Sequence, residues 1–167
     1  MVETIVDYLV ELFRDNIPRE LIVFVISMFP IVELRGGMIA AKLLDIELLK
    51  AFVICYIGNI LPIPFILLFI RKIFEFLKRF RRIGKVISKL EESSLRKSEK
   101  VKKGSRWGLL TFVAIPLPGT GGWTGSLIAA LLDMRIKISF PVIALGVLIA
   151  NFIMSIFSYG LLGALGL

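Results

Sequence analysis

Apolar residues fill most of the chain, and polar residues interrupt them at a few well-defined places. In residues 1–16, apolar positions recur every three or four residues with four acids on the opposite side, and Pro18 follows. This pattern predicts an amphipathic helix at residues 1–17 that lies at a membrane interface, because it is too charged to cross. The acidic start lacks the basic region of a signal peptide, so we expect the segment to stay on the protein.

Two apolar runs are long enough to cross a bilayer, which takes about twenty helical residues. The first covers residues 48–70, carries one charge, Lys50, at its edge, and would be about 34 Å long as a helix. The second covers residues 138–162. In the first run, Pro62 and Pro64 remove backbone donors, so we expect a kink or an opened helix there.

Two further apolar segments are broken near their centres. In residues 18–46, an apolar run of twelve residues, 21–32, is interrupted by Glu33 and Arg35 in FPIVELRGG, and residues 106–134 are interrupted by PLPGTGG. A helix that stops at such a tip near mid-membrane and returns to the side it came from forms a re-entrant hairpin. We predict one hairpin in each segment.

The chain repeats itself at a spacing of 88 residues. Without gaps, this shift gives eight identities in the thirty positions from Phe29 to Gly58. The identical pairs are Pro30 and Pro118, Gly37 and Gly125, Ala41 and Ala129, residues 43–45 and 131–133, Phe52 and Phe140, and Gly58 and Gly146. A hairpin contributes no crossing and a span contributes one, so the second half would be inverted. The predicted fold is an all-α membrane protein with an inverted repeat, each half a re-entrant hairpin plus one transmembrane helix.

An alternative has four kinked helices that all span the membrane, which would make the repeats parallel. The two arrangements differ in the position of residues 133–137, which the hairpin model places on the cytoplasmic side. Arg135 and Lys137 in that stretch favour the hairpin model, because basic residues collect on the cytoplasmic side.

Composition supports a single membrane domain. Hydrophobic residues make up 57% of the 167 residues, and the mean hydropathy is +0.87. The net charge is +8, and fourteen of the twenty-one Lys and Arg lie between Arg71 and Arg106. We therefore expect the linker 71–105 to be a cytoplasmic amphipathic helix on anionic lipid, and we do not expect nucleic acid as a partner.

Residue usage excludes several kinds of chemistry. The chain has no histidine and one cysteine, Cys55, which removes disulfides, Cys/His metal sites and histidine acid–base catalysis. We expect neither an enzyme nor a cofactor or metal site.

The first tip carries the strongest candidate residues, Glu33 and Arg35. An ionisable side chain at membrane depth costs several kcal/mol unless it is paired or wet, so both are functional candidates. The planar guanidinium suits a carboxylate or phosphate. Glu33 either orients Arg35 or titrates and couples transport to protons. The structural alternative is that the two residues simply pair with each other and with the tip backbone.

The second tip supplies glycines, the hydroxyl of Thr120 and the start of a new helix. Free N–H groups at a helix start form an anion site, and opposed hairpins would bring it near Arg35. A tight structural turn is the alternative. The Trp123 indole N–H needs a partner or a ligand, whereas Asn59 and Asn151 favour helix–helix hydrogen bonds. The candidates from both tips and the spans are Glu33, Arg35, Gly36, Asn59, Thr120, Gly121, Trp123 and Asn151.

The segments FPIVELRGGMIAA and IPLPGTGGWTGSLIAALLDM resemble the two signatures of the small multidrug export protein family, within the DedA superfamily of prokaryotic membrane proteins. The resemblance implies a multi-pass protein of the cell membrane with two opposed re-entrant hairpins. It also implies roles in flipping polyprenyl-phosphate carriers or scrambling phospholipids. By motif position, it carries over to Glu33 and Arg35 and to Pro116, Pro118 and Gly119.

We therefore expect a small membrane transporter whose opposed hairpins bind the anionic head group of a lipid. An alternative is a proton-coupled exporter of hydrophobic cations that uses Glu33, and a third is a membrane assembly protein without transport. Two spans and two hairpins bury little surface in one chain, so we expect a homodimer or larger assembly.

Overall fold

The computed structural model describes residues 18–79, 84–85, 87–89, 92 and 106–161, which form helices and turns without strands. The expected amphipathic helix at residues 1–17 and most of the linker 71–105 lie outside the described residues. The all-helical class is confirmed for the described part of the chain. Its elements are α2 (Arg19–Met28), α3 (Glu33–Leu43), α4 (Leu48–Ile60), α5 (Ile63–Leu77), α7 (Arg106–Ala114), α8 (Gly122–Leu131), α9 (Ile136–Ser155) and the π-helical segment η2 (Ile156–Leu161).

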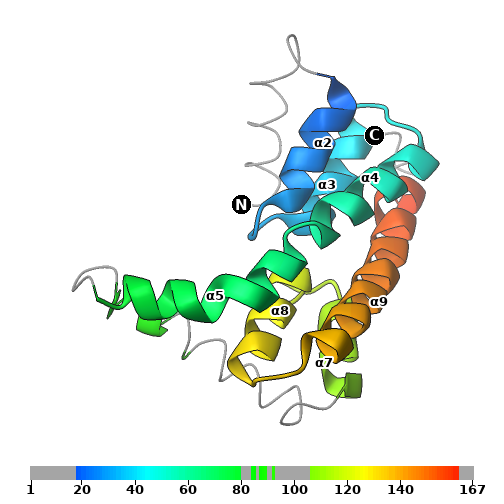
Figure 1. Ribbon diagram of the computed structural model, residues 1–167. Helices are drawn as coiled ribbons and strands as arrows, with labels where there is room; N and C mark the ends of the chain where they lie inside the picture. Colours follow the sequence, from blue (N-terminus) through cyan, green and yellow to red (C-terminus); the bar gives the residue numbers. More distant parts are fainter. Residues whose placement is uncertain (1–17, 80–83, 86, 90–91, 93–105, 162–167) are drawn as a thin grey trace.

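Two helical stretches are long and apolar enough to cross a membrane. They cover Leu48–Ile70 and Ile136–Gly160, each with a mean hydropathy of 2.3 in its most apolar part. The first is interrupted where prolines were expected to disturb it, because α4 ends at Ile60 and α5 begins at Ile63 after Pro62. The far end of α5 projects away from the other helices (Figure 1).

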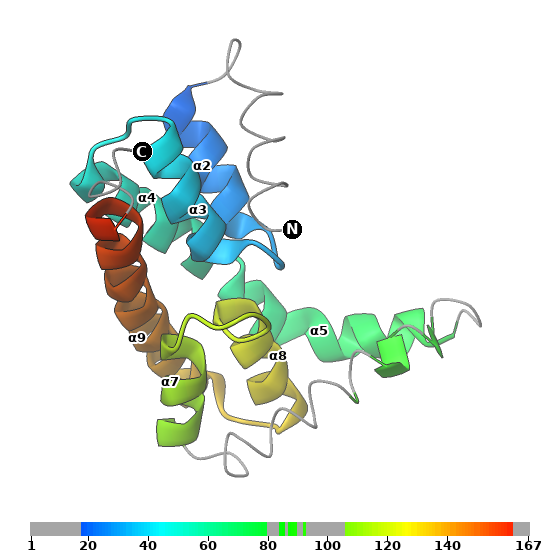
Figure 2. The ribbon, with the colours of Figure 1, turned by 180° about the vertical axis from the view of Figure 1, so that it is seen from behind.

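The remaining helices form two short pairs. Helices α2 and α3 are joined by the turn at residues 29–32, and α7 and α8 by the loop at residues 115–121. The first pair lies in one half of the molecule and the second in the other, and their connecting segments face each other near the middle (Figures 1 and 2). Helix α9 packs against members of both pairs, α3, α7 and α8, and against α4.

The two halves share backbone features at the 88-residue spacing. Asp45 and Asp133, just after α3 and α8, have φ values of 53° and 55°. Glu33 and Gly121, at the start of the same two helices, have φ values of 52° and 114°. Aspartate adopts this left-handed conformation more readily than most residues, whereas glutamate does so at a cost. The sequence repeat therefore extends to the points where each pair turns.

Glycines let the helices of each half approach closely. A Cβ on Gly58 of α4 would lie 2.8 Å from the Phe24 carbonyl oxygen of α2, and a Cβ on Gly146 of α9 would lie 2.7 Å from Cβ of Val113 in α7. Gly58 and Gly146 are 88 residues apart, so each long helix contacts the first helix of its own half in the same way.

Substituting Gly146 with alanine is expected to lower the free energy of unfolding by about 1–3 kcal/mol, because α7 and α9 must separate to admit the methyl group. Thermal unfolding of the purified protein in detergent measures this. Gly160→Ala is the matched control, since the nearest atom to its added Cβ, Cγ2 of Ile156, is 3.9 Å away. Equal destabilisation by the two substitutions would contradict the packing argument.

Candidate functional site

Glu33 begins α3 at the tip of the first helix pair. Its backbone N–H donates to the Phe29 carbonyl at 2.8 Å, which closes the turn, and its φ of 52° is a strained value for a glutamate. The residue is only 3% exposed. Strain and burial of an acid at the same position are costly to stability, so this tip is a strong candidate for a functional site.

The Glu33 carboxyl group reaches across to the second helix pair. Its Oε1 accepts a hydrogen bond of 3.1 Å from the backbone N–H of Trp123, in the first turn of α8. The N-terminus of a helix favours a negative charge through its free N–H groups and its dipole. The absence of a Cβ on Gly121 admits the carboxyl group, because an added Cβ would collide with Oε2. The group that occupies this helix start is therefore the protein's own Glu33 carboxyl group.

Arg35 crosses to the same loop. Its Nη2 donates to the Thr120 carbonyl oxygen at 2.9 Å and to Thr120 Oγ1 at 3.0 Å. The Thr120 hydroxyl also accepts from the Leu117 N–H at 3.2 Å, and it donates to the carbonyl oxygen of Ile115 or Leu117, each 2.7 Å away. Arg35 thus binds a loop that Thr120 has already folded. Glu33 and Arg35 each bond the backbone of the second tip, which agrees with the backbone part of the structural alternative for these residues, and both contacts cross between the helix pairs.

The indole of Trp123 has a protein partner. Its Nε1 donates to the Met28 carbonyl oxygen at 3.1 Å. Met28 ends α2, where the last carbonyl groups of a helix lack intrahelical partners. Trp123 therefore joins the two tips through both its backbone and its side chain, and its indole serves as a cap for α2.

The two buried asparagines have different surroundings. Asn151 Nδ2 donates to the Phe52 carbonyl oxygen at 2.8 Å, which is the expected helix–helix bond, here between α9 and α4. Asn59 near the end of α4 is fully buried, and a Cβ added to Gly122 would lie 2.5 Å from its Oδ1. Neither polar atom of the Asn59 amide completes a hydrogen bond within the described part of the chain.

The other candidates shape the tips. Gly36 is buried, and its N–H donates to the Val32 carbonyl oxygen at 3.2 Å. Pro116 is half-buried, whereas Pro118 and Gly119 are exposed, and Gly119 has a φ of 78°. Sequence reasoning did not single out Gly122, whose missing Cβ accommodates Asn59. The 88-residue repeat contained a signal for the Glu33 contact, since it aligns Glu33 with Gly121.

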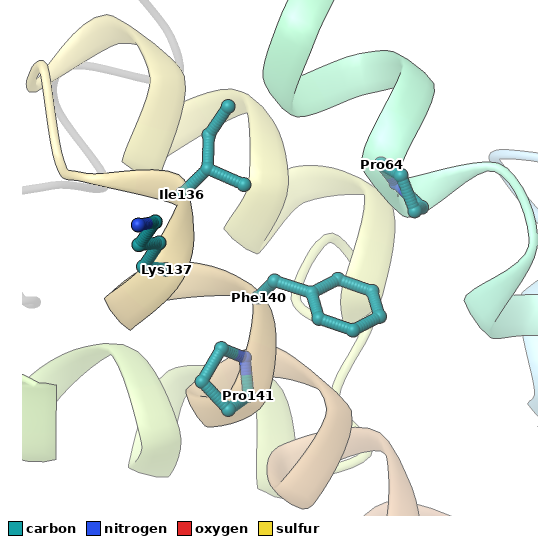
Figure 3. Close-up of a pocket in the computed structure, with 5 residues that line it drawn as sticks. All are labelled: Pro64, Ile136, Lys137, Phe140 and Pro141. Carbon is teal, nitrogen blue, oxygen red and sulfur yellow. The ribbon is translucent and has the colours of Figure 1, made fainter.

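One groove in the described structure lies away from these tips. It has a volume of about 500 Å³ and lies between Pro64 of α5 and the first turns of α9, at Ile136, Lys137, Phe140 and Pro141 (Figure 3). Its lining is almost wholly apolar. Among the described residues, no group of His, Cys, Asp or Glu could hold a metal ion. The tip contacts therefore carry the candidate site.

The fold and the site together define a helical membrane protein with a buried acid and a basic residue that bond across two short helix pairs. Residues 33–153 match the model of the family described as "Putative small multi-drug export protein". Because the match covers well over half of the chain, the protein belongs to this family, whose description names a transporter. The matched range includes Glu33, Arg35 and the whole second tip. No curated protein and no solved structure matches the chain.

Proposed function

We propose that the protein is an exporter of small amphipathic molecules that works by separating and rejoining the two helix-pair tips. The observation that supports this most is the pair of contacts across the tips, Glu33 to Trp123 and Arg35 to Thr120. A path between the tips opens only when both contacts break. The family description of the chain agrees with export.

The proposal includes opposed re-entrant hairpins and an inverted repeat. Helices α2 and α8 each have ten residues, or about 15 Å, which is half of the hydrocarbon core of about 30 Å. Two such helices that meet end to end would place their tips at mid-membrane. The facing tips (Figure 2) and the backbone features shared at 88 residues support this arrangement. The linker 71–105 would then lie on the cytoplasmic side of the cell membrane.

Glu33 is the proposed coupling residue. As a carboxylate it is attracted to the N-terminus of α8 and holds the tips together. Protonation removes the charge and with it much of this attraction, so uptake of a proton from one side would release the contact. Loss of the proton to the other side would restore it.

Replacing Glu33 with glutamine is expected to reduce export at least tenfold, because glutamine cannot gain and lose a proton. The measurement is efflux of ethidium, a hydrophobic cation, from cells that express the protein in the presence of an imposed pH gradient. Glu47→Gln makes the same chemical change at an exposed position and should export as the wild type does. Unchanged efflux by Glu33→Gln would refute the coupling role.

A second function, transport of an anionic lipid, is favoured by one observation. The α8 N-terminus and the Arg35 guanidinium are the donors that a phosphate would use, and a lipid phosphate could take the place of the Glu33 carboxylate. Scrambling of a fluorescent anionic phospholipid in liposomes tests it, and Arg35→Ala should abolish scrambling. Flux of ethidium without lipid flux would eliminate this function, and flux of neither would favour a membrane assembly protein.

We also propose a homodimer or larger assembly. Many large apolar side chains of α5 and α9 are exposed in the single chain, among them Phe65, Leu68, Leu145 and Phe152. Lipid can cover this surface, and so can a second copy.

A further inference from the structure

Asn59 is a polar residue whose local surroundings do not explain its presence. It lies in α4, a helix that is otherwise apolar at this level, and its side chain is fully buried. Its neighbours include Ile63 and Val147, which line the same contact with Gly122. A buried amide without hydrogen bonds lowers stability, so a leucine of nearly the same size would fit this position better.

The position of Asn59 relative to Glu33 suggests what it does. The Glu33 carboxyl group lies where a Cβ on residue Gly121 would be, and the Asn59 amide lies against the position of a Cβ on Gly122. The two side chains are thus held against consecutive glycines at the start of α8. The Asn59 amide is therefore next to the Glu33 carboxyl group along the start of α8, and neither of its polar atoms has a hydrogen-bond partner among the described residues.

We propose that Asn59 is a positioning residue for Glu33 that supports both of its protonation states. When Glu33 is ionised, the Asn59 amide turns from its position in this structure, where it has no hydrogen-bond partner among the described residues, and its Nδ2 donates a hydrogen to Glu33 Oε2. When a proton from solvent binds Oε2, the amide rotates and its Oδ1 accepts the new O–H hydrogen. An amide can do this because it carries a donor and an acceptor at similar positions. This role rests on the proposed function, since it requires Glu33 to take up and release a proton.

The other charged and donor groups that face Glu33 favour its ionised state. Arg35 on its own helix has a permanent positive charge, and α8 presents backbone N–H donors and has no ionisable side chain. Helix α2 contributes the Met28 carbonyl, which accepts a hydrogen bond from the Trp123 indole. These groups favour the ionised carboxylate. Asn59 on α4 therefore supplies the acceptor that a protonated Glu33 needs.

Trp123 provides a readout that does not depend on transport. The chain has two tryptophans, and Trp107 is 77% exposed, so Trp107→Phe leaves Trp123 as the single emitter. Its backbone N–H binds Glu33, so its fluorescence should titrate with that carboxyl group. We expect the titration to vanish in Glu33→Gln and its midpoint to move by roughly half a pH unit or more in Asn59→Leu. Asn151→Leu, at the other buried asparagine, should leave the midpoint in place.

Thermal unfolding of the same variants separates this role from a structural one. Asn151→Leu breaks the bond to Phe52 and should lower the melting temperature, whereas Asn59→Leu should leave it unchanged or raise it. Should Asn59→Leu not fold, Asn59→Asp keeps the size and shape and places a second carboxyl group beside Glu33, which should move the midpoint further.

Two results would overturn the proposal: a midpoint that does not respond to substitution of Asn59, or the lack of any titration in the single-tryptophan protein. The proposed function has a separate outcome. If ethidium efflux is absent while the titration behaves as described, export is wrong and the role of Asn59 stands.

Discussion

Replacing Gly121 with alanine is expected to abolish export and to lower the free energy of unfolding by about 3 kcal/mol. Gly121 has φ of 114° and ψ of −169°, a conformation that is essentially confined to glycine and costs about 1–3 kcal/mol for other residues. The added Cβ would also collide with Glu33 Oε2 and lie 3.1 Å from Nη2 of Arg35. One methyl group therefore disturbs both contacts between the tips. Ethidium efflux and thermal unfolding in detergent measure the two effects.

Gly119→Ala controls for backbone strain in the same loop. Gly119 also has a positive φ, of 78°, but it is exposed. We expect the Gly119→Ala variant to lose some stability and to keep most of the export activity. If Gly121→Ala exported as well as Gly119→Ala, the contact of Glu33 with the start of α8 would have no functional role.

Arg35→Ala is expected to destabilise the protein by about 2–3 kcal/mol, because it removes the bonds of the guanidinium to Thr120 and a positive charge two residues from the buried Glu33. The expected loss of stability is smaller than for breaking a fully buried ion pair, because the Arg35 side chain is partly exposed. The Arg35→Ala/Glu33→Gln double variant removes the uncompensated charge. It should therefore be more stable than Arg35→Ala alone, a coupling that melting temperatures can measure.

Arg106→Ala is the control for loss of a positive charge, since Arg106 is exposed at the start of α7. It should leave the melting temperature unchanged. A double variant that is less stable than Arg35→Ala would show that Glu33 contributes to stability by some means other than charge.

Within the described residues, the sequence was sufficient to predict the two long apolar helices and the break at the prolines of the first. Length and hydropathy identified the two long apolar helices, and Pro62 correctly predicted the interruption between α4 and α5. Both follow from local physical rules, since proline lacks a backbone donor and a span needs a minimum length. The polar residues Glu33 and Arg35 stood out because they interrupt an apolar run. The family resemblance is also confirmed, whereas its wider DedA assignment and the inverted hairpins stay predictions.

The partners of the candidate residues could not be predicted in the same way. Glu33 bonds a residue 90 positions away and Arg35 one that is 85 positions away. Glu33 bonds the start of α8, where the sequence predicted an anion site, but nothing in the local sequence shows that Glu33 lies there. Asn59 and Asn151 look equivalent along the chain. Only their three-dimensional neighbours distinguish the asparagine that links two helices from the one that lies beside Glu33.

The contact between Glu33 and Gly121 explains why the two halves benefit from being joined in one polypeptide. These residues occupy the same position of the 88-residue repeat, yet one supplies a carboxyl group and the other the space for it. A symmetric pair of identical halves would bring acid against acid or glycine against glycine, and neither makes this contact. Fusion lets each copy diverge, so that a single carboxyl group can lie where symmetry would otherwise impose two or none.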